Sequence, residues 1–300
     1  MTPVLPPFSL PMFICVFSTM PSFPPSFFTY VYTTVPSVSP SICTCVSSTI
    51  LPCWFRHHKT LKLRCPPPAR SLIAPSQNLT CHHGPGVLLI WCKISPYQQG
   101  AERARAAALE ILQRLDSSYV DLLLIHWPGA SKTKTTDPAN AKLRLESWRV
   151  LEELYEQGKL KAIGVSNYEE SHLKELASHA KIMPMVNQVE VHPQRPNTCL
   201  RQLCQDLGIA VVAYASLGCG HLLQNPIVLD VAQQTGKSPA QVLLRWGLQK
   251  GCAVIPKAAN PGHLIAAGEL LNWELPGDLE ARLDGLENGT KYCWDPSGIA

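Results

Sequence analysis

Tyr119-Val120-Asp121-Leu122-Leu123-Leu124-Ile125 is a run of strand-forming, mostly apolar residues, and His126 and Trp127 follow it directly. A continuous apolar run of this length is typical of a strand that is buried on both faces, as in parallel sheets. Active sites of parallel α/β proteins lie where such strands end. The segment therefore predicts one strand of a parallel sheet with functional groups at its carboxyl end.

Similar apolar runs alternate with amphipathic segments along the rest of the chain. Further strands are predicted at residues 87–92, 161–165, 185–189, 210–213 and 253–255, and helices at residues 101–115, 145–157, 169–179, 197–207 and 239–250. This alternation favours an α/β fold in which helices cover a parallel sheet. A barrel and a doubly wound sheet both have this order. The doubly wound sheet is the weaker alternative, because no Gly-rich phosphate loop follows a first strand.

The front of the chain has a different composition. No Asp or Glu precedes Glu102, while the first 101 residues carry six Lys or Arg. Ten prolines interrupt residues 1–55, and the longest proline-free run there, residues 41–51, is shorter than the roughly 20 apolar residues of a membrane helix. We therefore predict a Pro/Ser-rich, low-complexity and disordered leader over residues 1–86, and a folded domain over residues 87–300. A membrane anchor and a genuine small domain are the alternatives.

Two features of the leader bear on these alternatives. Residues 27–35 have the aromatic and β-branched content of a strand, although no partner strand is evident. The Cys and His residues between positions 53 and 83 match no standard zinc spacing, so we expect no metal site. The five cysteines from Cys199 to Cys293 have no paired spacing and suit reduced thiols of a cytoplasmic protein.

Polar or amphipathic groups follow six apolar runs in succession. They are Lys93, His126 with Trp127, Ser166 with Asn167, Gln188, Tyr214 and Lys257. Taken singly, each has an ordinary structural explanation, since a Lys after a strand is usually at the surface and Ser-Asn often caps a helix. Because the carboxyl ends of parallel strands meet on one face, we predict that these six positions converge on a common mouth.

The same strand ends carry longer motifs. They are Lys93-Ile94-Ser95-Pro96, Asp121-Leu122-Leu123-Leu124-Ile125-His126-Trp127-Pro128, Gly164-Val165-Ser166-Asn167-Tyr168, Asn187-Gln188-Val189-Glu190-Val191-His192-Pro193 and Ile255-Pro256-Lys257. They resemble signatures of the aldo-keto reductases, as does the tail Tyr292-Cys293-Trp294-Asp295-Pro296. The resemblance runs in order from about residue 88 to 298. It implies a (β/α)8 TIM barrel that is incomplete here, with about six of the eight β/α units.

The resemblance also implies a reaction. Enzymes of this family move a hydride from NADPH to a carbonyl carbon while an acid protonates the oxygen. By analogy, His126 would donate to the developing oxyanion and Trp127 would form an apolar wall of the substrate pocket. Lys93 would lie beside a tyrosine phenol and lower its pKa. Lys93 and His126 are thus the implied catalytic residues, and His126 and Trp127 the implied substrate contacts.

The cofactor-binding residues follow from the same analogy. Ser166, Asn167 and Gln188 would hold the nicotinamide carboxamide, and Tyr214 would stack on the nicotinamide ring. Lys257 would meet the adenosine 2′-phosphate and so favour NADP(H) over NAD(H). His263 stands where the family usually has a basic residue, and an imidazole, which is mostly neutral near pH 7, is a poor substitute for a guanidinium.

The chain departs from the family pattern ahead of Lys93. The family's acid is a tyrosine on the second strand-to-helix connection, with an aspartate a few residues before it. No aspartate occurs before Asp116, and the sequence around Tyr30 and Tyr32 does not resemble that segment. Loss of a positioned general acid typically costs roughly 10² to 10⁴ in rate. Loss of about two strands would leave unpaired edges on the barrel.

Two functions from different classes follow. The first is a cytoplasmic NADP(H)-dependent oxidoreductase that reduces small aldehydes or ketones to alcohols, acts as a monomer and has no nucleic-acid or membrane partner. The second is a catalytically inactive remnant of such an enzyme, produced by a partial gene and binding cofactor weakly. The absence of the family's aspartate favours an inactive protein. The intact motifs favour membership of the enzyme family.

Overall fold

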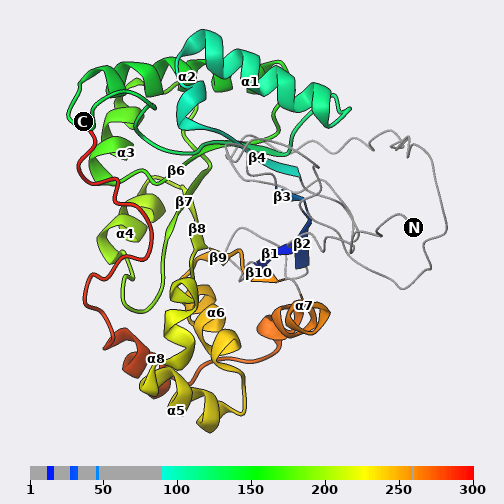
Figure 1. The fold of residues 1–300 in the computed structure, drawn as a ribbon, viewed down its shortest axis with the longest axis vertical. Helices are drawn as coiled ribbons and strands as arrows, with labels where there is room; N and C mark the ends of the chain where they lie inside the picture. Colours follow the sequence, from blue (N-terminus) through cyan, green and yellow to red (C-terminus); the bar gives the residue numbers. More distant parts are fainter. Residues whose placement is uncertain (1–11, 17–27, 33–44, 47–89, 259) are drawn as a thin grey trace, which may run out of the picture.

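Six strands run parallel in a curved sheet, with helices along its outer side (Figure 1). The structure is a computed structural model, and it describes residues 12–16, 28–32, 45–46, 90–258 and 260–300. The parallel strands are β4 (Ile90–Ile94), β5 (Leu122–Ile125), β6 (Ile163–Ser166), β7 (Val186–Glu190), β8 (Ala210–Tyr214) and β9 (Ala253–Val254). They pair in sequence order from β4 to β9, as the strands of a (β/α)8 barrel do.

Eight α-helices belong to the described residues. They are α1 (Ala101–Arg114), α2 (Ala139–Glu156), α3 (Glu170–His179), α4 (Thr198–Asp206), α5 (Pro226–Thr235), α6 (Pro239–Gln249), α7 (Pro261–Gly268) and α8 (Gly277–Asp284). Three short 3-10 helices accompany them: η1 (Pro96–Gln98), η2 (Gly218–Gln224) and η3 (Glu269–Asn272). The arrangement is that of an incomplete (β/α)8 barrel with about six of its eight units, as the sequence predicted.

Local sequence explains where the helices begin. The Ser238 hydroxyl accepts a hydrogen bond from the backbone N–H of Gln241, whose side chain accepts from the backbone N–H of Ser238 in return. Pro239 occupies the first turn of α6, where no backbone N–H is needed. At α5 the Asn225 side chain accepts from the backbone N–H of Ile227. These caps fix the first turns of α5 and α6, which follow each other in the chain and pack against each other.

Two apolar layers hold the barrel together. The outer layer lies between the sheet and the helices and includes two fully buried tryptophans, Trp148 of α2 and Trp246 of α6. The inner layer fills the concave side of the sheet and consists of Trp91, Leu122, Leu124, Ala162, Val186, Val212 and Ala253. A barrel of this type is a packed core rather than a pore, so the inner layer forms the floor beneath the strand ends.

Gly164 is required by the packing of the inner layer. A Cβ atom at this position would lie 2.5 Å from the Val186 carbonyl oxygen and 2.7 Å from Leu124 Cδ2. Both distances are far below van der Waals contact, and one of the two neighbours is backbone that cannot move aside. The absence of a side chain at Gly164 therefore lets β5, β6 and β7 close on one another.

The observed elements correct several sequence-based bounds. Lys93, Ser166 and Tyr214 lie inside their strands, whereas they were expected to follow them. The reason is that these strands run past the last apolar residue, because backbone pairing continues where the side chains become polar. Helix α2 begins at Ala139, six residues before the predicted start, and α5, α7 and α8 were not predicted.

The leader contributes three short strands to the sheet. They are β1 (Met12–Val16), β2 (Phe28–Tyr32) and β3 (Cys45–Val46). β1 pairs antiparallel with β9, with the two-residue strand β10 (Lys257–Ala258) and with β2, and β3 pairs antiparallel with β4. Two expectations were therefore wrong: Phe28–Tyr32, the described part of residues 27–35, pairs with β1, and β4 and β9 each have an antiparallel neighbour. The leader pairs with two residues of β4 and one residue of β9, which covers part of each edge.

The remaining predictions for residues 1–86 fall on positions outside the described residues. This applies to disorder along most of the leader and to the Cys and His residues between positions 53 and 83. Among the helices that the structure describes, none is both long enough and apolar enough to cross a bilayer.

Candidate active site

The candidate site continues the inner layer of the barrel toward the carboxyl ends of the strands. Side chains alternate between the two faces of a strand, so residues two apart point the same way. Counting in twos from inner-layer residues leads from Trp91 to Lys93, from Leu124 to His126, from Ala162 through Gly164 to Ser166, from Val186 to Gln188, from Val212 to Tyr214, and from Ala253 through Ile255 to Lys257. The alternation of side chains along the strands thus places these strand-end residues on the same side of the sheet.

Hydrogen bonds join four of these side chains across three strands. The Lys93 ammonium donates to the Gln188 side-chain oxygen, and the Ser166 hydroxyl donates to the Gln188 backbone carbonyl at 2.8 Å. The Asn167 amide donates to Ser166 Oγ at 3.2 Å. Lys93 and Gln188 are both buried, at 8% and 2% exposure. Burial of an ammonium is costly unless it is solvated by polar partners, so the Gln188 amide is a necessary neighbour of Lys93.

Asn167 links this chain to the two remaining members. Its amide donates to the His126 backbone carbonyl at 3.0 Å, and its side-chain oxygen accepts from the Tyr214 hydroxyl at 2.6 Å. Its backbone is left-handed, with φ at +63°, a conformation that Asn tolerates better than most residues. Lys93, His126, Ser166, Asn167, Gln188 and Tyr214 thus form one hydrogen-bonded group, which we call the strand-end cluster.

His126 is the half-buried histidine of the cluster. Burial lowers the pKa of its imidazole from 6.5 to about 4, and the nearby Lys93 charge adds to this effect. The ring is therefore neutral at pH 7, with one N–H donor and one nitrogen acceptor. A neutral imidazole beside a buried ammonium can donate a hydrogen bond to a carbonyl oxygen without a proton transfer.

Tyr214 is the aromatic member of the strand-end cluster. Burial raises the pKa of its phenol, and the anionic forms of Cys293 and Glu190 raise it further. The hydroxyl therefore stays protonated and remains a donor to Asn167. With the hydroxyl held, the partly exposed ring is fixed in orientation at the end of β8.

Trp127 lies at the rim and contacts the C-terminal tail. Its indole meets that of Trp294 edge to face, with ring centroids 6.3 Å apart and planes at 89°. Trp294 is 84% exposed, so the pair forms an apolar surface open to solvent. The buried Gln99 side chain donates to the Trp127 backbone carbonyl at 2.6 Å and to that of Gly129 at 2.9 Å. These bonds fix the loop that follows β5.

Lys257 and His263 do not belong to the strand-end cluster. Lys257 lies in β10 and His263 on α7, and both side chains are exposed. Among the described residues, no hydrogen bond or ion pair joins either side chain to the cluster. Direct contacts thus unite five of the six predicted strand-end positions, whereas the sixth, Lys257, lies on β10.

The comparisons with known proteins agree with this geometry. Residues 88–288 match the model of the aldo/keto reductase family. The chain belongs to the aldo-keto reductase family. It is 42% identical over 212 residues to the glyoxal reductase of Bacillus subtilis (strain 168), a match that covers 71% of this chain and 73% of the relative.

Solved structures of aldo-keto reductases superpose on the barrel. An aldo-keto reductase called MGS-M4, from a Medee basin deep-sea metagenome library, has a TM-score of 0.62 at 33% identity and covers 68% of this chain and 72% of its own. A mutant of Gox0644 in complex with NADPH also has a TM-score of 0.62, at 32% identity, and covers 68% of this chain and 73% of its own. This second structural relative of the aldo-keto reductase therefore binds NADPH.

Sequence reasoning missed several residues of the site. Gln99 and Trp294 support Trp127, and Tyr292 binds the loop after β8, yet none of these roles was predicted. Gln99 lies three residues after the Lys93-Ile94-Ser95-Pro96 motif, but a single Gln has no repeating pattern that would indicate a role. Trp294 and Tyr292 lie far along the chain from their partners, so only the fold brings them together.

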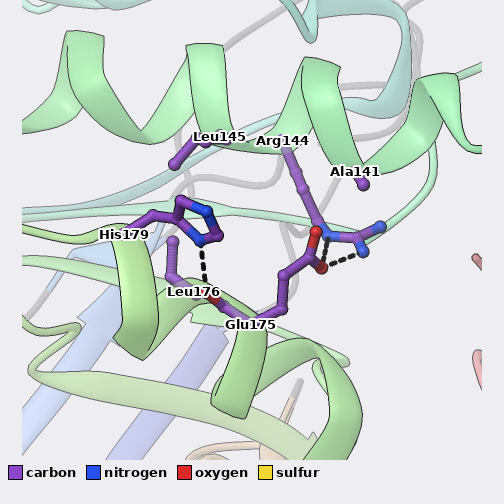
Figure 2. A pocket seen from close by; sticks show the side chains of 6 residues that line it. All are labelled: Ala141, Arg144, Leu145, Glu175, Leu176 and His179. Carbon is purple, nitrogen blue, oxygen red and sulfur yellow. Dashed lines mark hydrogen bonds and ion pairs between the residues drawn. The ribbon is translucent and has the colours of Figure 1, made fainter.

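A small pocket lies away from the strand-end cluster, between α2 and α3 (Figure 2). Arg144 and Glu175 form an ion pair inside it, and the Arg144 guanidinium also donates to the backbone oxygen of Ala300 at 2.6 Å. The polar groups of this pocket therefore bind each other and Ala300. We assign the pocket a structural role in this aldo-keto reductase, not a ligand-binding one. No group of three or more His, Cys, Asp or Glu side chains suited to a metal occurs among the described residues.

Proposed function

We propose that this aldo-keto reductase uses NADP(H) to reduce small aldehydes or ketones to alcohols. The strand-end cluster carries the proposal, because it gathers a neutral imidazole, a buried ammonium and an amide-rich floor at the carboxyl ends of the strands. The name of the Bacillus subtilis relative, a glyoxal reductase, supports a small carbonyl substrate. The NADPH complex of a structural relative supports the cofactor.

The chemistry of the cluster fits the nicotinamide end of NADP(H). When bound, the cofactor would supply the hydride. Ser166, Asn167 and Gln188 offer one hydroxyl and two amides, the group types that bind a carboxamide in both directions. Tyr214 presents a ring whose hydroxyl is held by Asn167, which leaves its face as a platform for a second planar ring. Ser166, Gln188 and Tyr214 lie on three adjacent strands, and Asn167 directly follows the first of these strands.

The adenosine end has a weaker set of partners. Lys257 offers an exposed ammonium that suits a phosphate, and His263 offers an exposed imidazole on α7. An imidazole is a weaker partner for a phosphate than an ammonium or a guanidinium, so Lys257 would provide most of the preference for NADP(H) over NAD(H). We expect the strand-end cluster to provide most of the cofactor affinity, and Lys257 to provide the selectivity for NADP(H) over NAD(H).

His126 and Lys93 would act on the carbonyl. The neutral imidazole of His126 would donate a hydrogen bond to the substrate oxygen, and the Lys93 ammonium would stabilise the negative charge that grows there. Trp127 and Trp294 would exclude water from one side of the substrate. The low pKa of His126 keeps its ring uncharged. The proton that completes the alcohol would therefore come from the side of the site where the Lys93 ammonium lies.

The test is NADPH oxidation with a small aldehyde by the purified full chain and by His126→Ala. We expect turnover by the wild type and a loss of about 10² to 10³ in kcat for the variant, the usual effect of removing one oxyanion donor. His179→Ala is the matched control, because His179 is exposed on α3, outside the cluster.

The same measurement separates the alternative function. An inactive remnant with weak cofactor binding is favoured by the absence of any aspartate before Asp116. It predicts no turnover by the wild type above the rate of His126→Ala. A cytoplasmic location remains our expectation and is supported by the free thiols among the described cysteines.

A further inference from the structure

Two cysteines that are 74 positions apart in the chain face each other beside the tail. Cys219 lies in η2, after β8, and Cys293 lies in the tail; their sulfur atoms are 4.0 Å apart. Cys219 is exposed and Cys293 is half-buried, so a small reagent can reach the pair. We propose that Cys219 and Cys293 are a thiol pair that forms a reversible disulfide on reaction with a low-molecular-weight disulfide such as glutathione disulfide.

The distance is compatible with bond formation. A disulfide needs its sulfurs about 2.05 Å apart, so the gap must close by about 2 Å. Rotation of two short side chains covers such a distance when the backbones already lie side by side. The pair is free in the present structure, since both residues are thiols.

The backbones on both sides are fixed by neighbouring contacts. The Tyr292 ring stacks on His221, with centroids 5.1 Å apart and planes at 8°. The Tyr292 backbone N–H donates to the Glu190 carboxylate at 2.7 Å, and its hydroxyl donates to the Gln194 side-chain oxygen at 2.5 Å. The two hydrogen bonds bind Tyr292 to β7 and the segment after it, and the ring stacking binds it to η2, which contains Cys219; these contacts hold the two thiols near each other.

Gly218 shows that the loop is shaped for this contact. Its backbone is left-handed, with φ at +57°, and a Cβ atom there would lie 2.8 Å from Tyr292 Cε2 and 2.8 Å from Leu222 Cγ. Cys219 continues the left-handed turn, with φ at +52°. The tail can approach η2 this closely only because position 218 has no side chain.

The exchange proceeds in two balanced steps. The exposed Cys219, as thiolate, attacks one sulfur of glutathione disulfide, which forms a mixed disulfide and releases one glutathione thiolate. Cys293, as thiolate, then attacks the Cys219 sulfur, which forms the Cys219–Cys293 bond and releases the second glutathione thiolate. The protein loses two electrons and two protons, and the external disulfide is reduced to two thiols.

The surroundings of Cys293 assign the order of these steps. Burial raises the pKa of its thiol to about 12, and the negative charges of Glu190 and of the Cys219 thiolate contribute, while Lys291 opposes them. Cys293 is therefore a poor first nucleophile near pH 7. Once Cys219 is in a mixed disulfide, its charge no longer opposes ionisation of Cys293, and the attack becomes intramolecular.

The disulfide would also change the substrate site, an expectation that rests on the proposed function. Trp294 follows Cys293 directly and packs on Trp127, the proposed substrate wall. A disulfide at position 293 would tie this indole to the loop after β8 and hold it over the mouth. We expect the oxidised protein to reduce bulky aldehydes more slowly and small ones at nearly the same rate. The disulfide itself does not depend on that function.

The test is peptide mapping of the full-length protein after incubation with glutathione disulfide, under conditions where circular dichroism shows the native helical signal. Trypsin cleaves after Lys291 and isolates the tail peptide with Cys293, and a protease that cleaves at Asp206 separates Cys204 from Cys219. The expected product is a link between the Cys219 and Cys293 peptides that dithiothreitol removes. It should be the main oxidised form of both cysteines.

Variants make the result specific. Cys219→Ser should leave Cys293 a free thiol, and Cys293→Ser should leave Cys219 as a glutathione adduct. Cys199→Ser is the control, because Cys199 is exposed on α4 and its loss should not affect the link. Separate glutathione adducts on Cys219 and Cys293 in the wild type, or links from either one to other cysteines, would overturn the proposal. If the link forms but aldehyde turnover is absent, the proposed function fails while the disulfide stands.

Discussion

The two ends of the proposed cofactor site are built in different ways. At the nicotinamide end, the strand-end cluster is held by hydrogen bonds between β4, β6, β7 and β8, and Lys93, Ser166, Asn167 and Gln188 are buried. At the adenosine end, Lys257 and His263 are exposed side chains on β10 and α7. The first end is part of the barrel core, whereas the second is attached to its edge.

This difference predicts how each end responds to change. Residues of the strand-end cluster are linked to one another, so a substitution there should affect stability and ligand binding together. Lys257 and His263, at the adenosine end, share no hydrogen bond or ion pair with the cluster in the part of the chain that the structure describes, so a substitution there should affect binding alone. The predictions below test this contrast, beginning with the largest expected effect.

Gly164→Ala should destabilise the floor of the site most strongly. The added Cβ would approach the Val186 carbonyl oxygen to 2.5 Å and Leu124 Cδ2 to 2.7 Å, which forces β6 and β7 apart. Overpacking of this kind costs about 3 kcal/mol. Urea denaturation measures the loss in the free energy of unfolding. Gly158→Ala is the comparison, because no atom lies within 4 Å of a Cβ built there; it carries only the backbone strain of its positive φ.

Asn167→Ala should cost about 2 kcal/mol in the free energy of unfolding. It removes hydrogen bonds to the His126 carbonyl, Ser166 and the Tyr214 hydroxyl, and it places Ala in a left-handed backbone. Asn167→Gly loses the same bonds without that strain and should be less destabilised. Equal stability of the wild type and both variants in urea would show that Asn167 does not hold the cluster together.

The low pKa of His126 predicts acid sensitivity. Its folded pKa is about 4 and its unfolded pKa 6.5, so the unfolded state binds more protons between these values and stability rises with pH across this window. The contribution is complete above pH 6.5 and is lost as the pH falls toward 4. It amounts to about 1–2 kcal/mol, after allowance for partial exposure.

Chemical denaturation of the wild type and of His126→Gln at pH 7 and pH 4.5 measures this effect. The variant cannot gain a proton at this position, so its stability should fall less between the two pH values. His263→Gln, at an exposed position, is the control and should behave as the wild type does. Parallel pH dependence in all three proteins would exclude a neutral, buried role for His126.

Lys257→Ala should weaken NADPH binding about tenfold, the loss of one charge-assisted contact, and leave NADH binding and the urea midpoint unchanged. His263→Arg should tighten NADPH binding, because it adds a permanent charge at the same end. Fluorescence titrations with both cofactors supply the numbers. A change in stability with either variant would contradict the division between the two ends.

Much of the barrel could be predicted from periodicity. The strand at Leu122–Ile125 and the helix at Ala101–Arg114 lie within three residues of their expected positions, because both have strong apolar patterns. The parity of the strand-end residues was equally accessible, since a period of two is a property of the sequence. Periodicity did not show that Lys93 and Tyr214 lie inside their strands, because a polar residue after an apolar run can be the last part of the strand or the first part of the loop.

The rest depends on tertiary contacts. β1 and β3 pair with β9 and β4, and nothing local in a proline-rich segment indicates such partners. Trp294 meets Trp127 across 167 positions, and Cys219 meets Cys293 across 74. Contacts at such separations leave no periodic trace in one sequence. Asn167 is intermediate, because Asn tolerates the left-handed backbone found there but does not require it.

Gln188 offers the most direct test of the claim that the strand-end cluster binds the nicotinamide end of NADPH. Gln188→Glu keeps an oxygen acceptor for the Lys93 ammonium but removes the amide donor. Titration calorimetry with NADPH should give one site per wild-type chain and an affinity at least about tenfold weaker for the variant. Equal affinity of the two proteins, or no binding by the wild type, would contradict the claim.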